Sequence, residues 1–131
     1  MDFRDLPADE RWDTVLLMGG NLGVAGDWEP TRSLLMSLAT NTGPHGRLIG
    51  DSVDPTTDEV EGLAFEERNR AAGFHRGHVR LRLHYGSLAT PWWDLLNLPP
   101  SDLEPLIEGT PWMLGESLGD DDGDAVLLRR R

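Results

Sequence analysis

Polar residues follow two apolar stretches of the chain, at points where a strand would give way to a turn. Residues 15–18 are all apolar and run straight into a Gly-Gly-Asn sequence that ends at Asn21, and a second stretch over residues 46–51 ends with Asp51. An asparagine amide can hold a substrate in place, and a carboxylate can orient a substrate or act as a general base. In an open α/β sheet, ligands bind in the crevice beyond the carboxyl ends of the strands. Asn21 and Asp51 are therefore the candidate catalytic residues.

Both residues also have ordinary structural explanations. Asn21 follows Gly19 and Gly20, and asparagine is common in turns because it tolerates a left-handed backbone. Asp51 falls at the end of an expected strand, where a carboxylate can be a surface loop residue or a helix cap. The sequence leaves these alternatives open at both positions.

A strand, a helix and a second strand are expected to position these residues. Residues 13–18 are predicted to form a strand buried on both faces, because its apolar run shows no polar alternation. Residues 31–40 are predicted to form the helix and residues 46–51 the second strand, parallel to the first through a right-handed crossover. The apolar face of the helix consists of Leu34, Leu35 and Leu38. This βαβ unit would bring both candidate residues to the same edge of the sheet.

The sequence of residues 57–97 predicts an accessory region. Residues 57–72 are expected to form a partly exposed helix, or a helix and a loop, with an acidic first half that suits a helix N-terminus. Residues 79–85 alternate between apolar and polar side chains, which predicts a half-buried strand. Residues 87–97 are expected to continue as a strand or as an extended cover.

The last third of the chain predicts a short helix and a hairpin. Residues 101–104 read Ser-Asp-Leu-Glu, the pattern of a capping box that opens a helix, and Gly109 ends that helix. Residues 112–118 and 125–130 are two strands joined by an acidic turn that contains Asp-Gly. The predicted fold class is thus α/β, with parallel strands followed by a C-terminal antiparallel hairpin.

The composition excludes several classes of function. The 131 residues suffice for one domain, and the absence of cysteine rules out disulfides and thiolate sites. All 12 basic residues are arginine, and the net charge of −11 disfavours binding to nucleic acid. No apolar run approaches the ~20 residues that span a membrane, and residues 2–5 do not resemble a signal peptide. We therefore expect no nucleic acid or membrane partner and a cytoplasmic location.

The histidines do not have the spacing of a metal site, so no metal is predicted. His75 and His78 are three residues apart, but an expected loop between Gly73 and Gly77 does not fix them on one helical face. Either histidine could act as a general base if the loop folds over the cleft. The alternative is that both are solvated loop residues.

Large side chains near residue 90 admit two interpretations. Trp92 and Trp93 could cover a substrate pocket, although at least one of them is expected in the core. Arg80 and Arg82 could bind an anionic substrate, or they could lie on a solvated strand face and pair with the surplus acidic residues.

Three segments in this order resemble the C-terminal half of a class I S-adenosylmethionine-dependent methyltransferase. They are Trp-Asp-Thr-Val-Leu-Leu-Met at residues 12–18, Thr-Gly-Pro-His-Gly-Arg-Leu-Ile-Gly-Asp at residues 42–51, and Glu-Gly-Thr-Pro-Trp at residues 108–112. The resemblance covers nearly the whole chain. It implies a Rossmann-like partial sheet and methyl transfer from S-adenosylmethionine to a small molecule.

The resemblance also implies a set of cofactor-binding residues. Asp2 matches the carboxylate that accepts a hydrogen bond from the adenine amino group, and Phe3 matches the side chain that lines the adenine pocket. Gly19, Gly20 and Asn21 follow the strand that lies beside the methionine part of the cofactor. In this chemistry positioning of the methyl group carries the rate, so an obligatory base need not exist.

Two parts of the family's pattern have no counterpart here. The glycine-rich loop after the family's first strand and the ribose-binding acid after its second strand are both missing. Residues 1–131 are therefore predicted to form a single partial domain, whose first strand has an unpaired edge that invites another chain. We expect either a homodimer or a complementary N-terminal half to complete the site. The alternative function is a non-catalytic remnant or interaction module.

Overall fold

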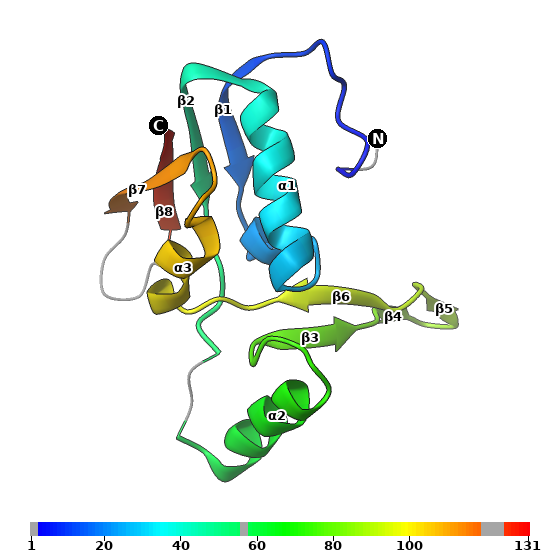
Figure 1. The fold of residues 1–131 in the computed structure, drawn as a ribbon. Coiled ribbons are helices and arrows are strands. Elements are labelled where there is room, and N and C mark those ends of the chain that lie inside the picture. The colour runs from blue at the N-terminus through cyan, green and yellow to red at the C-terminus, as the bar shows by residue number, and fades with distance from the viewer. Residues whose placement is uncertain (1–2, 56–57, 119–124) are drawn as a thin grey trace.

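The computed structural model describes residues 3–55, 58–118 and 125–131. Its helices and strands follow one another along the chain as Figure 1 shows. In order they are β1 (Trp12–Leu17), η1 (Asn21–Gly23), α1 (Trp28–Thr40), β2 (Thr42–Gly50), α2 (Val60–Ala71), β3 (His78–Leu81), β4 (His84–Tyr85), β5 (Leu88–Ala89), β6 (Trp93–Leu96), η2 (Pro100–Asp102), α3 (Leu103–Ile107), β7 (Trp112–Leu118) and β8 (Ala125–Arg130).

The predicted βαβ unit is present. β1 and β2 are parallel and adjacent, with Val15 opposite Leu48 and Leu17 opposite Gly50. α1 connects them and begins three residues before the predicted start, because Pro30 is compatible with the first turn of a helix. The carboxyl ends of β1 and β2 therefore lie side by side, as the candidate site requires.

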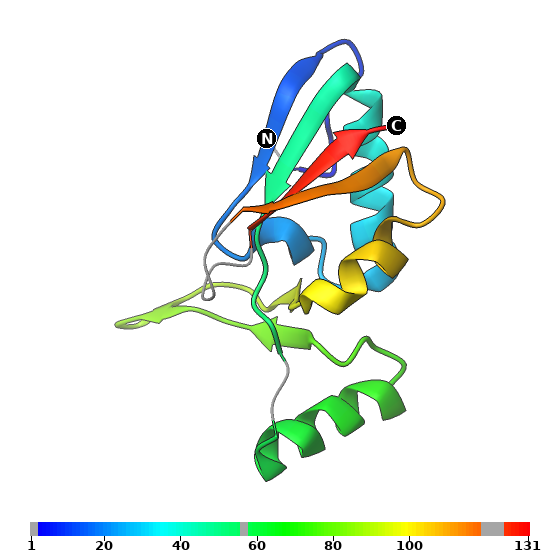
Figure 2. The ribbon, with the colours of Figure 1, turned by 90° about the vertical axis from the view of Figure 1, so that its left-hand side faces the viewer.

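The C-terminal hairpin completes a mixed sheet. β7 and β8 have the predicted bounds and pair antiparallel, and β8 also pairs antiparallel with β2. The strand order is β1-β2-β8-β7, so β1 lies at one edge. This arrangement, visible in Figure 2, confirms the predicted α/β class with parallel strands and an antiparallel hairpin.

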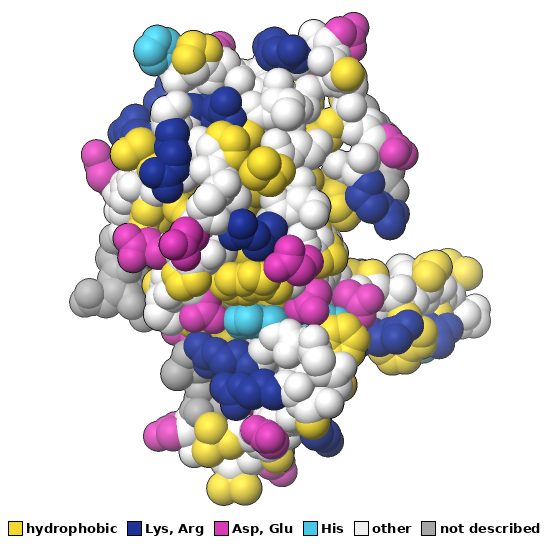
Figure 3. All heavy atoms as spheres, viewed as in Figure 1, with side chains coloured by type: hydrophobic (Ala, Val, Ile, Leu, Met, Phe, Trp, Pro, Cys, Tyr) yellow, Lys and Arg dark blue, Asp and Glu magenta, His cyan; other side chains and the backbone are white. Residues whose placement is uncertain are grey.

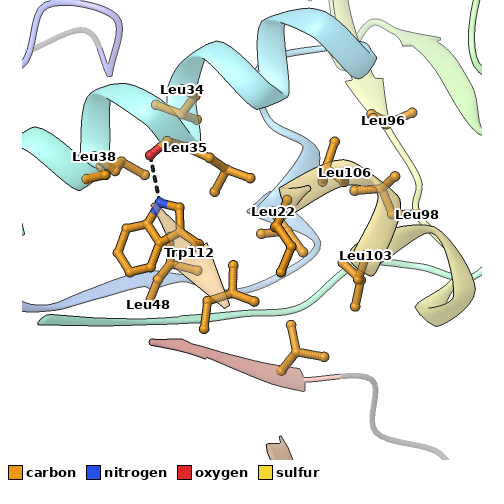
Figure 4. Close-up of a cluster of buried hydrophobic side chains, with 14 residues drawn as sticks. Leu22, Leu34, Leu35, Leu38, Leu48, Leu96, Leu98, Leu103, Leu106 and Trp112 are labelled. Carbon is orange, nitrogen blue, oxygen red and sulfur yellow. Dashed lines mark hydrogen bonds between the residues drawn. The ribbon is translucent and has the colours of Figure 1, made fainter. Parts of the chain in front are cut away.

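The core lies between this sheet and the helices α1 and α3 (Figure 4). Trp112 of β7 is fully buried, and its indole Nε1 donates a hydrogen bond of 2.7 Å to the carbonyl oxygen of Leu35 in α1. Leu48 of β2, Leu128 of β8 and Leu106 of α3 are also fully buried. One tryptophan thus joins the hairpin to the helix that crosses between the parallel strands.

The prediction that β1 is buried on both faces is wrong. Leu16 is 63% exposed and Met18 is 43% exposed, whereas Val15 and Leu17 are partly buried against the core. The reason is that α1 and α3 lie on the same face of the sheet, and no helix of the described residues covers the opposite face (Figure 2). β1 therefore presents both an unpaired edge and an apolar face.

An accessory region separates β2 from α3, and it differs from its prediction in several ways. β3 ends at Leu81 and pairs only with β6, after which β4 and β5 form a separate two-stranded hairpin. Leu83 and Tyr85 are exposed because that hairpin packs on nothing beneath it, so the expected half-buried strand over residues 79–85 is wrong beyond β3. Trp92 is exposed and Trp93 is only partly buried, so neither is a core residue.

Two helices of the chain also depart from expectation. α2 begins at Val60 rather than at residue 57, which lies outside the described residues. The capping box at residues 101–104 does not form, because Ser101 lies within η2, which runs directly into α3, and its hydroxyl donates a hydrogen bond of 3.3 Å to Asp102 Oδ1. Among the described residues no helix has the length and apolar character needed to cross a membrane.

Candidate functional site

The turn after β1 owes its shape to two glycines. Gly19 and Gly20 both have a φ of +77°, a conformation that is costly for other residues. Asn21 then begins η1, and its side-chain Nδ2 donates a hydrogen bond of 2.7 Å to the carbonyl oxygen of Met18. The side chain of Asn21 is exposed, and in this conformation its amide nitrogen closes the turn locally.

Asp51 holds this turn against the end of β2. Its Oδ1 accepts a hydrogen bond of 2.6 Å from the backbone N–H of Gly20. Its backbone N–H donates to the carbonyl of Leu17 at 3.1 Å, and its carbonyl accepts from the N–H of Leu22 at 3.1 Å. The structure therefore brings the two predicted catalytic residues together at the carboxyl ends of β1 and β2. The contact with Gly20 makes Asp51 a residue that positions the turn.

The predicted adenine-side residue Phe3 lines a cavity beside α1. This cavity has a volume of about 280 Å³. Its lining residues are Phe3, Arg4, Ala25, Pro30, Ser33, Leu34 and Ser37. Since Ala25 lies two residues beyond η1, the cavity joins the N-terminal segment to the loop that follows the turn. Asp2 lies outside the described residues.

A band of charged side chains connects the accessory region to the rest of the molecule (Figure 3). His75 Nε2 lies 2.7 Å from Asp102 Oδ2, and the ring is stacked on Trp28 with a centroid distance of 5.3 Å. The backbone N–H of Gly77 donates to His75 Nδ1 at 3.0 Å, so Nε2 carries the proton donated to Asp102. Both ring nitrogens are thus engaged, which leaves His75 no free nitrogen to act as a base.

His78 is held in a similar way on β3. Its Nε2 lies 3.2 Å from Asp94 Oδ1, and its ring stacks on Phe74. The alternative that His75 and His78 are solvated loop residues is therefore wrong, because only 14% and 8% of their side chains are exposed. No set of three or more histidines, cysteines or carboxylates within the described part of the chain could hold a metal ion.

The sequence does not predict that Asp102 and Asp27 form hydrogen bonds with His75. Asp27 Oδ1 accepts a hydrogen bond from the backbone N–H of His75 at 3.1 Å, across 48 residues of sequence. Asp102 is 27 residues from His75 and was interpreted as part of a capping box. No local pattern signals contacts at such separations, so only the folded chain reveals them.

Comparison with known proteins finds similarity only at the level of structure. No protein-family model matches the chain, and no curated protein matches it. Among solved structures, an S-adenosylmethionine-dependent methyltransferase from Bacteroides fragilis, in complex with S-adenosyl-L-homocysteine, superposes with a TM-score of 0.67 at 18% identity. That match covers 92% of this chain but 47% of the other. The chain has part of a methyltransferase fold.

Two further matches give the same result. The CcbJ methyltransferase from Streptomyces caelestis has a TM-score of 0.65 at 11% identity, with 99% of this chain and 62% of that chain covered. The sugar N-methyltransferase KedS8 from Streptoalloteichus has a TM-score of 0.62 at 15% identity, with 100% and 61% covered. This chain thus spans about half to two thirds of the length of the methyltransferases that it matches. The resemblance inferred from the sequence is confirmed for the fold.

Replacing Asp51 by alanine is expected to loosen the turn. The N–H of Gly20 would lose its acceptor in a partly buried position, which costs about 1–3 kcal/mol of folding free energy. Amide hydrogen exchange at Gly20 and Leu22 should accelerate, and chemical denaturation should report the loss of stability. The control is Asp13→Ala, because Asp13 is an exposed carboxylate of β1. Equal stability of the two variants would contradict the positioning role of Asp51.

Proposed function

We propose that this chain contributes one side of the cofactor site of an S-adenosylmethionine-dependent methyltransferase that acts on a small molecule. The observation that carries the proposal is the turn at the carboxyl ends of β1 and β2, where Asp51 accepts a hydrogen bond from Gly20 and Asn21 follows as an exposed side chain. This is the position at which α/β sheets bind ligands. The fold matches part of a methyltransferase, and the resemblance assigns that turn to the methionine side of the cofactor.

The residues present fit one side of such a cofactor. Phe3 offers an aromatic face in a cavity, and the resemblance assigns it to the adenine together with Asp2. Gly19 and Gly20 have no side chains, so a ligand can approach the backbone of the turn closely. Asn21 remains the candidate for orienting the methionine part of the cofactor or the methyl acceptor. When bound, the cofactor supplies an electrophilic methyl group.

The chain's own residues would act by positioning. Methyl transfer requires in-line approach of the acceptor atom, and orientation of reactants can supply most of the rate. The contact between Asp51 and Gly20 joins the turn to the end of β2, and Asn21 lies at the exposed end of the turn. As a catalytic residue Asp51 would orient the acceptor through its second oxygen, which requires no change in the hydrogen bond to Gly20.

A complementary N-terminal half is the partner that suits β1. Residues of this half would pair with the open edge of β1 and cover Leu16 and Met18, which are exposed apolar side chains. An unpaired apolar edge strand favours such pairing. A second copy of the chain is the other candidate for this edge.

The test is titration of S-adenosylhomocysteine into the full chain, followed by calorimetry and by backbone amide NMR. We expect saturable binding with shifts at Phe3, Gly19, Gly20 and Asn21. Asn21→Ala and Asp2→Ala should each weaken binding about tenfold, the loss of one hydrogen bond of roughly 1.4 kcal/mol. Asp9→Ala is the matched control for Asp2, since Asp9 is exposed in the same segment.

A folded sample that shows no binding at millimolar cofactor would contradict a site on this chain. It would favour the alternative, a non-catalytic remnant or interaction module that retains the sheet.

A further inference from the structure

The accessory region is divided into two blocks of opposite charge. Residues 54–67 contain six acidic residues and no arginine, and residues 68–93 contain five arginines and no acidic residue. The chain as a whole has 23 acidic and 12 basic residues, so a stretch of this length without a carboxylate stands apart from the rest. The acidic block includes the start of α2, and the basic block includes β3, β4 and β5.

Within the described residues, ion pairs join the two blocks where they meet. Glu66 lies 3.3 Å from Arg70 and 3.4 Å from Arg76, and Glu67 lies 3.7 Å from Arg70. Farther from the junction, two carboxylates and two arginines form no ion pair within the described residues. Asp58 and Glu61 at the start of α2 form no ion pair there, and neither do Arg80 and Arg82 beyond it. Two charged patches of opposite sign therefore remain open on one chain.

Each open patch also carries apolar side chains. We call residues 80–92 the arm, because β4 and β5 project from the molecule in Figures 1 and 2 and every residue of this segment is exposed. Tyr85 is 86% exposed and Leu88 is 71% exposed, and they help to line a hollow of about 420 Å³. On α2, Val60 is 83% exposed and Leu63 is 50% exposed. Figure 3 shows apolar and charged side chains together on the arm and on α2.

Within the described residues, β4 and β5 of the arm join no larger sheet. β4 and β5 are two residues long and pair only with each other. A two-stranded hairpin without further packing is at best marginally stable in water. A partner that covers Tyr85 and Leu88 and neutralises Arg80 and Arg82 would therefore stabilise it.

We propose that the arm binds the acidic start of α2 in a second copy of this chain, and that the contact is reciprocal. In a twofold dimer the arm of each copy contacts α2 of the other copy, so the same contact between arm and α2 occurs twice. Arg80 and Arg82 then face Asp58 and Glu61, and the exposed apolar side chains of the two patches pack together. A polyanion such as nucleic acid suits the arm less well, because the rest of the chain holds all 23 acidic residues and repels it.

The first experiment measures the mass of the full chain by light scattering and sedimentation equilibrium. We expect a dimer at low ionic strength whose dissociation constant rises at least tenfold between 50 and 500 mM salt, because exposed charges are screened over about one Debye length. Tyr85→Ser with Leu88→Ser should weaken the dimer at both salt concentrations. A chain that remains monomeric at all concentrations overturns the proposal. So does a monomer that instead binds anionic vesicles or polynucleotide through the arm.

Charge reversal identifies the two surfaces. Arg80→Glu with Arg82→Glu makes both patches acidic, and Asp58→Arg with Glu61→Arg makes both basic, so each double variant should be monomeric. Mixed in equal amounts, the two variants should form a heterodimer, since each acidic patch then meets a basic one. Arg47→Glu with Arg129→Glu is the control, because these exposed arginines lie opposite each other on β2 and β8 and away from both patches.

These experiments test the contact between the arm and α2 independently of the proposed function. Dimers that persist in either reversed variant, or a mixture that stays monomeric, overturn the proposal. Leu16→Ser with Met18→Ser alters the exposed face of β1 and should leave the dimer intact. If this variant alone dissociates the dimer, the second copy lies at β1 and the inference about the arm is wrong.

Discussion

Trp112→Ala should lower the free energy of unfolding by about 3–5 kcal/mol, the cost typical of deleting a fully buried tryptophan. The indole is completely inaccessible to water, and its N–H donates to the carbonyl of Leu35. It lies where α1 packs on the hairpin, and the guanidinium of Arg130 lies 5.8 Å from its ring centroid. Removing the ring would therefore leave a cavity between α1 and β7 and delete the hydrogen bond that joins them.

Urea denaturation monitored by circular dichroism measures this effect. Trp112→Phe separates the contribution of packing from that of the hydrogen bond, because phenylalanine fills much of the space but cannot donate a hydrogen bond to the carbonyl of Leu35. The expected loss for that variant is smaller than for alanine. Trp92→Ala is the matched control, since Trp92 is exposed on the arm and should change stability by no more than about 0.5 kcal/mol. Similar losses for the alanine variants at Trp112 and Trp92 would contradict the assigned core.

The parts of the fold predicted correctly are those that local patterns determine. The apolar run before Gly19 and the leucine spacing of α1 identify a strand and a helix within 25 residues of one another. A helix that connects two adjacent strands is typical of a βαβ unit, in which the strands are parallel, as β1 and β2 are. The bounds of β7 and β8 follow from two apolar runs flanking an Asp-Gly turn, a turn that itself lies outside the described residues.

The topology also predicted part of the candidate site. Because parallel strands share an edge at their carboxyl ends, Asp51 was expected near Asn21. The hydrogen bond from Gly20 to Asp51 depends on the turn's two left-handed glycines, and no sequence rule specifies which amide such a carboxylate will bind. The assignments of Asp2, Phe3 and Asn21 to a cofactor rest on resemblance and remain predictions.

The failures have a common physical cause. Alternation over residues 79–85 indicates amphipathic character, but whether one face is buried depends on an element that packs against it. The arm has none in its own chain, so Leu83 and Tyr85 are exposed. The apolar run of β1 likewise indicates two buried faces, and the described residues cover one. In both places the sequence pattern indicates an apolar face suited to burial, but no other described element of the chain covers that face.

Gly23→Ala is the second change with a large expected effect. A Cβ atom at this position would lie 1.8 Å from the carbonyl oxygen of Leu96 and 2.7 Å from its carbonyl carbon. Overpacking commonly costs about 1–3 kcal/mol when side chains can yield. Here the opposing atoms belong to the backbone of β6, so we expect a loss at or above the upper end of that range.

The position of Gly23 links the candidate site to the accessory region. η1 packs directly on β6 through this glycine, and Leu22 beside it is 1% exposed. To accommodate a methyl group, η1 must move away from β6 and take Asn21 with it. The variant should therefore change the amide resonances of Gly19, Gly20 and Asn21 as well as those of β6.

Gly43→Ala is the matched control for that measurement. Its added Cβ would meet no atom within 4 Å, so stability and the amide resonances of the turn should be nearly unchanged. If Gly23→Ala is as stable as Gly43→Ala and leaves the turn undisturbed, the close contact of η1 with β6 is wrong. If instead the turn shifts while the sheet stays folded, the accessory region holds the turn in place. Its association with any partner would then act on the candidate site through this contact.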